Sequence, residues 1–95
     1  MAATPEARVK AAIRRKLKAA GAYYVMPIGT GFGTSGVLDF SVCHKARYIG
    51  IEAKAGKNQP TALQLKNIAD IRAAGGIALV INEDNLHELD EVLNG

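Results

Sequence analysis

The hydrophobic positions of this chain change period along its length, which predicts alternating helices and strands. Residues 5–20 repeat apolar side chains at the spacing of a helix that buries one face. Thr4 and Pro5 precede this repeat as N-cap and first helical residue, and Gly21 follows it as C-cap. The apolar stripe of this first helix consists of Val9, Ala12, Ile13, Leu17 and Ala20.

Three strands are predicted in the middle of the chain. Residues 23–28, 37–43 and 48–54 have the apolar content and alternation of extended segments. A glycine-rich loop separates the first strand from the second, and a four-residue turn, 44–47, joins the second to the third. The second and third strands pair as an antiparallel hairpin whose apolar faces must coincide, because a slip of one residue turns one apolar set toward water.

The last third of the chain predicts a helix, a strand and a helix. A long helix opens at Pro60 or Thr61 and closes at 75–76, where two glycines occur. Residues 77–81 form an uninterrupted apolar run, which is typical of a strand buried on both faces. A short amphipathic helix follows. The order α-β-β-β-α-β-α over residues 1–95 predicts one domain of the α/β class, a mixed sheet flanked by helices.

Composition is that of an ordered globular protein. Hydrophobic residues make up 48% of the chain and charged residues 22%, which argues against disorder. No apolar run approaches the roughly 20 residues that a membrane span needs, and no signal-peptide core follows the N-terminus. The single cysteine, Cys43, excludes an internal disulfide and suits a reducing cytoplasm. We therefore expect a cytoplasmic protein without a membrane partner.

The charge is distributed unevenly and indicates a polyanionic partner. The chain carries a net charge of +3, but the first 82 residues hold all twelve basic and only four acidic residues, a net charge of +8. Such a surface attracts a polyanion, of which DNA is one. A solvated helix face is the alternative explanation for the basic residues of the first helix. The basic residues expected at DNA are Arg8, Lys10, Arg14, Arg15, Lys18 and, in the loop before the second long helix, Lys57.

The glycine-rich loop is a second candidate for DNA contact. Residues 31–36 match the pattern G-x-G-x-x-G. A dinucleotide site needs a helix to begin inside that motif, however, and residues 37–43 predict a strand. We favour a loop whose amides and hydroxyls approach a DNA backbone, and a plain hairpin loop is the alternative. The residues concerned are Thr30, Gly31, Gly33, Thr34 and Ser35.

Two carboxylates and a lysine form the candidate reaction centre. The hairpin register places Asp39 directly across from Glu52, with Cβ atoms about 5 Å apart. At an effective dielectric near 20, two such charges repel by roughly 3 kcal/mol. This repulsion is a large fraction of the total stability of a domain, about 5–15 kcal/mol, so we expect the pair to have a function. A divalent cation between them turns the repulsion into coordination, and oxygen ligands suit Mg²⁺ or Mn²⁺.

Lys54 shares a strand face with Glu52, one step past the acids. From there its ammonium is placed to reach a phosphate oxygen or the attacking water. A surface salt bridge between Glu52 and Lys54 is the alternative. On the neighbouring strand Asp39 lies with Val37, opposite Leu38.

Two polar residues also lie on packed helix faces. Glu6 points along the buried stripe of the first helix at its open end, and a first-turn glutamate favoured by the helix dipole is the alternative explanation. Gln64 lies at the border of the packed side of the second long helix. The alternative to a role in the site is a buried amide whose hydrogen bonds are satisfied.

In order and spacing, these residues resemble the VRR-NUC (virus-type replication-repair nuclease) domain of the PD-(D/E)xK nuclease superfamily. The resemblance covers about residues 5–82 and departs at Leu38, where many superfamily members have proline before the aspartate. It implies a restriction-endonuclease-like sheet and phosphodiester hydrolysis on branched, flap or Holliday-junction DNA, as in DNA repair. It rests on Thr4-Pro5-Glu6, Gly36-Val37-Leu38-Asp39, Ile51-Glu52-Ala53-Lys54, Gln64 and Gly75-Gly76.

The resemblance also implies roles for single residues and an assembly. Small phage and bacterial members look like homodimers, which implies the cytoplasm of a bacterial or phage-infected host cell. A catalytically silent nucleic-acid-binding module and a sequence-specific restriction-like endonuclease stay open as alternatives. The implied catalytic residues are Glu6, Asp39, Glu52, Lys54 and Gln64. The implied ligands of Mg²⁺ or Mn²⁺ are Asp39, Glu52, the backbone carbonyl of Ala53 and, directly or through water, Glu6.

Overall fold

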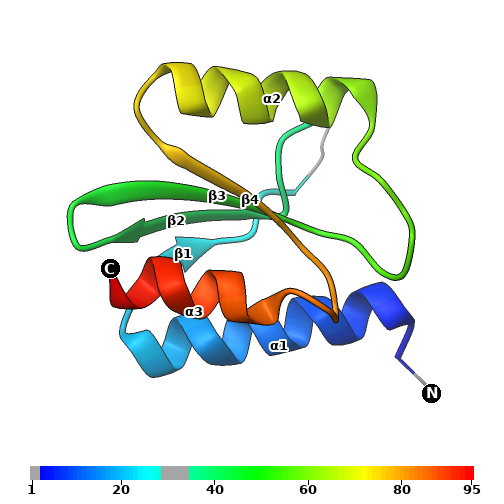
Figure 1. The fold of residues 1–95 in the computed structure, drawn as a ribbon, viewed down its shortest axis with the longest axis horizontal. Helices are drawn as coiled ribbons and strands as arrows, with labels where there is room; N and C mark the ends of the chain where they lie inside the picture. Colours follow the sequence, from blue (N-terminus) through cyan, green and yellow to red (C-terminus); the bar gives the residue numbers. More distant parts are fainter. Residues whose placement is uncertain (1–2, 29–34) are drawn as a thin grey trace.

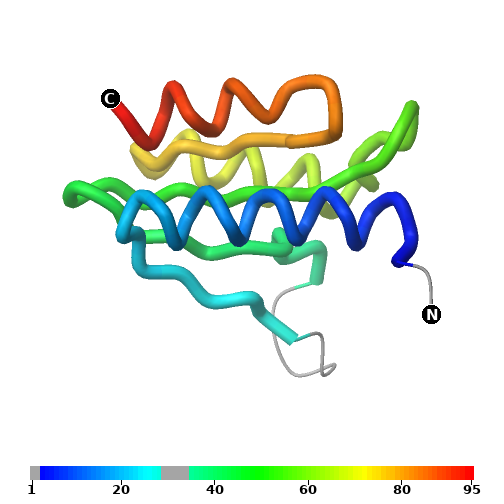
Figure 2. The backbone as a smooth tube through the Cα atoms, turned by 90° about the horizontal axis from the view of Figure 1, so that it is seen from below, coloured from blue at the N-terminus to red at the C-terminus, as the bar shows by residue number. Residues whose placement is uncertain are grey.

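In the computed structural model, which describes residues 3–28 and 35–95, a four-stranded sheet lies between helices (Figure 1). Helices α1 (Pro5–Ala20) and α3 (Leu86–Asn94) cover one face of the sheet, and α2 (Ala62–Ala73) covers the other. Figure 2 shows α1 and α3 running side by side. The chain order is α-β-β-β-α-β-α. The predicted α/β class, a mixed sheet flanked by helices, is therefore confirmed.

The strands are arranged across the sheet in chain order, β1 (Tyr23–Val25), β2 (Phe40–His44), β3 (Arg47–Ala53) and β4 (Ile77–Ile81). Strand β2 is antiparallel to both of its neighbours, β1 and β3, and β4 is parallel to β3. A parallel neighbour requires a long crossover, which α2 supplies. This crossover places α2 over β3 and β4. No helix of the described residues is long and apolar enough to cross a membrane.

The hairpin of β2 and β3 has the predicted register and a tighter turn than predicted. Phe40 lies opposite Ile51, and the pairing continues to His44 opposite Arg47. Only Lys45-Ala46 is left as the loop, with φ angles of 53° and 63°. Two left-handed residues form the turn whose twist matches that of the paired strands. The predicted four-residue turn is therefore two residues shorter.

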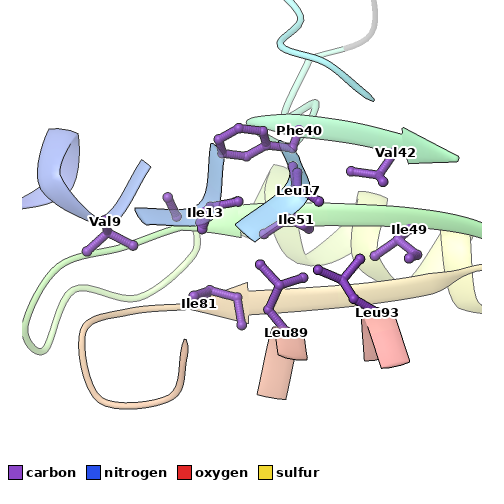
Figure 3. Close-up of a cluster of buried hydrophobic side chains, with 11 residues drawn as sticks. Val9, Ile13, Leu17, Phe40, Val42, Ile49, Ile51, Ile81, Leu89 and Leu93 are labelled. Atoms are coloured by element: carbon purple, nitrogen blue, oxygen red, sulfur yellow. The ribbon is translucent and has the colours of Figure 1, made fainter. Parts of the chain in front are cut away.

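The main core fills the space between the sheet and the pair α1 and α3 (Figure 3). The predicted stripe of α1 supplies Val9, Ile13 and Leu17, all buried. Alternate residues of the strands face this stripe, because successive side chains of a strand point to opposite faces. Burying these apolar side chains is the main stabilising contribution to the fold. The strand and α3 side chains in this core include Phe40, Val42, Ile49, Ile51, Ile81, Leu89 and Leu93.

Strands β1 and β2 are shorter than predicted, and Leu38 lies on the other face. Leu38 packs with Ile68 and Ala78 beneath α2, on the opposite side of the sheet from the main core. Gly36, at φ 76°, passes so near α2 that an added Cβ would lie 2.6 Å from the backbone carbon of Leu63. The chain bends at Asp39, so the strand that was predicted to begin at residue 37 begins at Phe40.

Candidate active site

Four predicted site residues gather at the end of the sheet where β2 begins and β3 ends. Asp39 immediately precedes β2, Glu52 is the penultimate residue of β3, and Lys54 follows that strand. Gln64 comes from the first turn of α2. Segments that are distant in sequence thus supply one small polar cluster. It lies at the far end of the hairpin from the turn.

Side-chain-to-backbone hydrogen bonds join Asp39 to Glu52 and to the next residue of β3, Ala53. The backbone N–H of Asp39 donates to Glu52 Oε1 at 3.2 Å. The backbone N–H of Ala53 donates to Asp39 Oδ2 at 2.9 Å. These bonds continue the hairpin one step beyond its last ladder pair. The structure therefore brings together the two carboxylates that the hairpin register places opposite each other.

Glu52 is the only charged residue among the described residues that is buried, with 2% of its surface exposed. Burial raises the pKa of Glu52 from its ordinary value, and the nearby charge of Asp39 raises it further. Lys54 and the Asp39 backbone N–H act in the opposite direction on this pKa. A carboxylate in this position is costly unless a cation and hydrogen-bond donors compensate its charge.

Lys54 and Gln64 both contact Glu52 Oε2. Lys54 Nζ lies 3.3 Å from this oxygen, and the Gln64 amide Nε2 donates to it at 2.9 Å. The side chains of Lys54 and Glu52 are 14% and 3% exposed. The pair is therefore not a surface salt bridge, and the predicted placement of both side chains on one face is confirmed. The Lys54 backbone N–H donates to the carbonyl of Ile81 at 2.9 Å, which anchors Lys54 just beyond β3.

The start of α2 orients Gln64 through a capping box. The Thr61 hydroxyl accepts from the Gln64 backbone N–H at 3.2 Å, and Gln64 Oε1 accepts from the Thr61 backbone N–H at 2.9 Å. This reciprocal pair stabilises the beginning of the helix. Because Oε1 is occupied by Thr61, the Gln64 amide nitrogen is directed toward Glu52. The packed-side placement of Gln64 is confirmed, and its amide is satisfied there.

Lys10 lies between two carboxylates on the side of the site that faces α1. Its ammonium is 3.6 Å from Glu6 Oε2 and 3.6 Å from Asp39 Oδ1. Glu6 thus lies at the end of α1 nearest the site, but its side chain is 41% exposed rather than buried, and Lys10 lies between it and Asp39. Residue spacing alone groups Lys10 with the DNA-contact candidates and does not predict that its ammonium lies near Asp39. The available signal is its place one helical turn after Glu6, where an ion pair forms.

The other predicted DNA contacts are distributed over the surface. Lys16, a basic residue of α1 that was not among these predicted contacts, pairs with Asp90 at 2.8 Å and links α1 to α3. Ser35 is exposed, and its carbonyl accepts from Asn67 Nδ2 at 2.9 Å. Thr30, Gly31, Gly33 and Thr34 lie outside the described residues. The exposed basic candidates are Arg8, Arg14, Arg15 and Lys18 on α1 and Lys57 after β3.

The donor atoms at this end of the sheet fit a hard divalent cation. Among the described residues, no group of three or more His, Cys, Asp and Glu side chains is placed to hold a metal. Mg²⁺, however, is commonly bound by one or two carboxylates, with water and substrate phosphate completing its shell. Asp39 and the buried Glu52 provide two acidic groups, and the charge of Asp39 raises the pKa of Glu52. The implied third ligand, the backbone carbonyl of Ala53, belongs to the residue whose N–H donates to Asp39 Oδ2.

Comparison with known proteins gives no relative for this chain. No protein-family model matches it, and neither does a curated protein or a solved structure.

Proposed function

We propose that this protein is a metal-dependent DNA endonuclease that hydrolyses phosphodiester bonds. The supporting observation is the buried Glu52, which is hydrogen-bonded to Asp39 and lies 3.3 Å from the ammonium of Lys54. Folding this carboxylate beside another one lowers stability, and such arrangements are common at functional sites. The resemblance to VRR-NUC nucleases and the arrangement of the sheet agree with this proposal.

Each side chain of the site has a defined task in this reaction. Asp39, Glu52 and the Ala53 carbonyl would hold Mg²⁺ or Mn²⁺. When bound, the metal lowers the pKa of a coordinated water and polarises the phosphate. Lys54, fixed by its contact with Glu52, would stabilise the negative charge that develops on the phosphate oxygens. Gln64 would hold Glu52 in a single orientation through its hydrogen bond.

DNA as the substrate is supported by the charge of the chain. The first 82 residues carry a net charge of +8, and the basic side chains of α1 other than Lys10 and Lys16 are exposed. Phosphate contacts of this kind supply affinity without base specificity. Following the resemblance, we extend the proposal to branched or flapped DNA and to a homodimer, which would place two sites across a two-fold branch. The single free cysteine, Cys43, agrees with a reducing cytoplasm.

A catalytically silent nucleic-acid-binding module is the second candidate. It is favoured by Lys10, whose ammonium already lies near Asp39 Oδ1 and Glu6 in place of a metal ion. In such a module the acids would be balanced by lysines and the basic surface would bind DNA without cutting it. The two candidates differ in one measurable property, which is hydrolysis.

The test is a cleavage panel of flap, fork, four-way junction, duplex and single-stranded DNA, run with Mg²⁺ and with Mn²⁺. We expect cleavage of at least one branched substrate. Asp39→Ala and Lys54→Ala should each reduce the rate by about a hundredfold or more, the usual effect of removing a reacting or charge-stabilising group. DNA affinity should be kept, because both residues belong to the metal and reaction centre.

The matched control is Asp70→Ala, which removes an exposed carboxylate on α2 that pairs with Lys66. This variant should cleave like the wild type. A folded wild-type protein that binds the panel but cuts none of it with either metal would support the silent module instead.

A further inference from the structure

The oxygen of Asp39 that is free to bind a cation is the one that faces Lys10. Asp39 Oδ2 accepts the backbone N–H of Ala53 at 2.9 Å. Asp39 Oδ1 lies 3.6 Å from the Lys10 ammonium, which is also 3.6 Å from Glu6 Oε2. Lys10 therefore occupies the side of Asp39 from which a divalent ion would approach.

The two lysines of the site differ in how closely they contact their carboxylate partners and in how exposed their side chains are. Lys54 lies 3.3 Å from the buried Glu52, and its side chain is 14% exposed. Lys10 is 32% exposed, and its partners Glu6 and Asp39 are 41% and 22% exposed. Its distances of 3.6 Å exceed those of a hydrogen bond. A compact charge on a flexible four-carbon stem leaves such a position readily, so Lys10 is the more easily displaced cation.

We propose that Lys10 is the resident counter-ion of the site, and that a divalent metal binds by exchange with it. This inference rests on the proposed metal-dependent function. In the metal-free protein the Lys10 ammonium neutralises Asp39 Oδ1 and Glu6. Binding of Mg²⁺ or Mn²⁺ moves it away from Asp39 and frees Glu6 to face the metal. Lys10 thereby lowers the affinity for metal while keeping the acidic cluster balanced in its absence.

The experiment measures Mn²⁺ affinity by calorimetry, without DNA. Lys10→Met removes the charge but keeps an unbranched stem. It should bind Mn²⁺ about five- to tenfold more tightly than the wild type, the effect expected from losing one or two exposed ion pairs. Lys10→Arg retains the charge and should remain near the wild-type affinity. Lys10→Gln, neutral but polar, should show the same tightening as Lys10→Met and replaces it if that variant does not fold.

Lys16→Met is the matched control. Lys16 lies on the same helix, has a 29% exposed side chain, and pairs with Asp90 of α3 rather than with the site. Its removal changes the net charge equally and should alter Mn²⁺ affinity by less than about twofold, because the Lys16 ammonium contacts Asp90 rather than a carboxylate of the site.

The outcomes separate the exchange from the metal site itself. Suppose that the wild type binds Mn²⁺ and Glu52→Gln does not. Unchanged or weaker binding in the folded neutral Lys10 variants, or equal tightening in Lys16→Met, then overturns the exchange and leaves the proposed function standing. Absence of Mn²⁺ binding in every protein overturns both. Tightening confined to the neutral Lys10 variants supports the exchange.

Discussion

The carboxyl group of Glu52 is subject to opposing influences. Burial and the charge of Asp39 raise its pKa, whereas the ion pair with Lys54 and the Asp39 backbone N–H lower it, and the net change is upward. An acid whose pKa is raised by folding binds its proton more tightly in the folded state than in the unfolded state. The folded state therefore loses relative stability as the pH rises from the ordinary glutamate value of 4.5 through the raised pKa.

The variant Glu52→Gln removes this titration while keeping the size of the side chain. We expect its free energy of unfolding, relative to that of the wild type, to increase as the pH rises from about 4 to about 8. The measurement is urea unfolding of both proteins at several pH values, with a chelator present to exclude metal. A difference that stays constant, or that decreases with pH, would contradict the upward pKa of Glu52.

Among the elements, the β2–β3 hairpin connects the site to the C-terminal helix α3. At the turn end of the hairpin, Arg47 donates to the carbonyl of Val92 at 2.7 Å, and a ring nitrogen of His44 lies 3.1 Å from the carbonyl of Leu93. Helix α3 has no basic residue in its last turn. These contacts therefore supply partners for carbonyls that a helix end leaves unsatisfied. The hairpin is thus held by α3 at one end, while its other end carries the carboxylates.

The turn itself is strained, because Ala46 has a φ of 63°. Ala46→Gly should raise the free energy of unfolding by about 0.5–1 kcal/mol, since glycine adopts this conformation without a steric penalty. Ala19→Gly, at an exposed position in α1, is the control and should lower it by about 1 kcal/mol. Urea unfolding measures both. Similar destabilisation by the two substitutions would show that the turn is not strained at Ala46.

For the molecule as a whole, the site is a junction between separate parts of the fold. The segment before β2, the end of β3 and the start of α2 meet at Glu52, and α1 reaches the same place through Lys10. A cation bound there would contact groups from several elements at once. Because these groups are together only in the folded chain, metal binding would favour the folded state.

Thermal unfolding with and without Mn²⁺ measures this coupling. At about one hundred times the dissociation constant, a ligand that binds only the folded state stabilises it by about 2.7 kcal/mol. For a domain of this length the expected rise in Tm is about 10 °C or more. A chelator should reverse the rise, and Glu52→Gln should abolish it. An equal rise in Glu52→Gln would show that Mn²⁺ binds elsewhere.

The local pattern of residues was sufficient to predict the order of helices and strands and the register of the β2–β3 hairpin. Thr4, the stripe of α1 and Gly21 mark the first helix, because caps and periodicity are properties of neighbouring residues. The alternation around Phe40 and Ile51 permits one register, because a slip would expose the apolar set. This register alone brought Asp39 and Glu52 together in the sequence-based prediction of the site.

Only the tertiary structure decided how these carboxylates are surrounded. Glu52 is buried because α2 covers that face of the sheet and directs Gln64 toward it. Lys10 meets Asp39 because α1 packs across the opposite face with its first turns at the end of the sheet that carries the site. Burial and ion pairing of this kind depend on the distances between elements far apart in the chain. The pattern of neighbouring residues contains no measure of those distances.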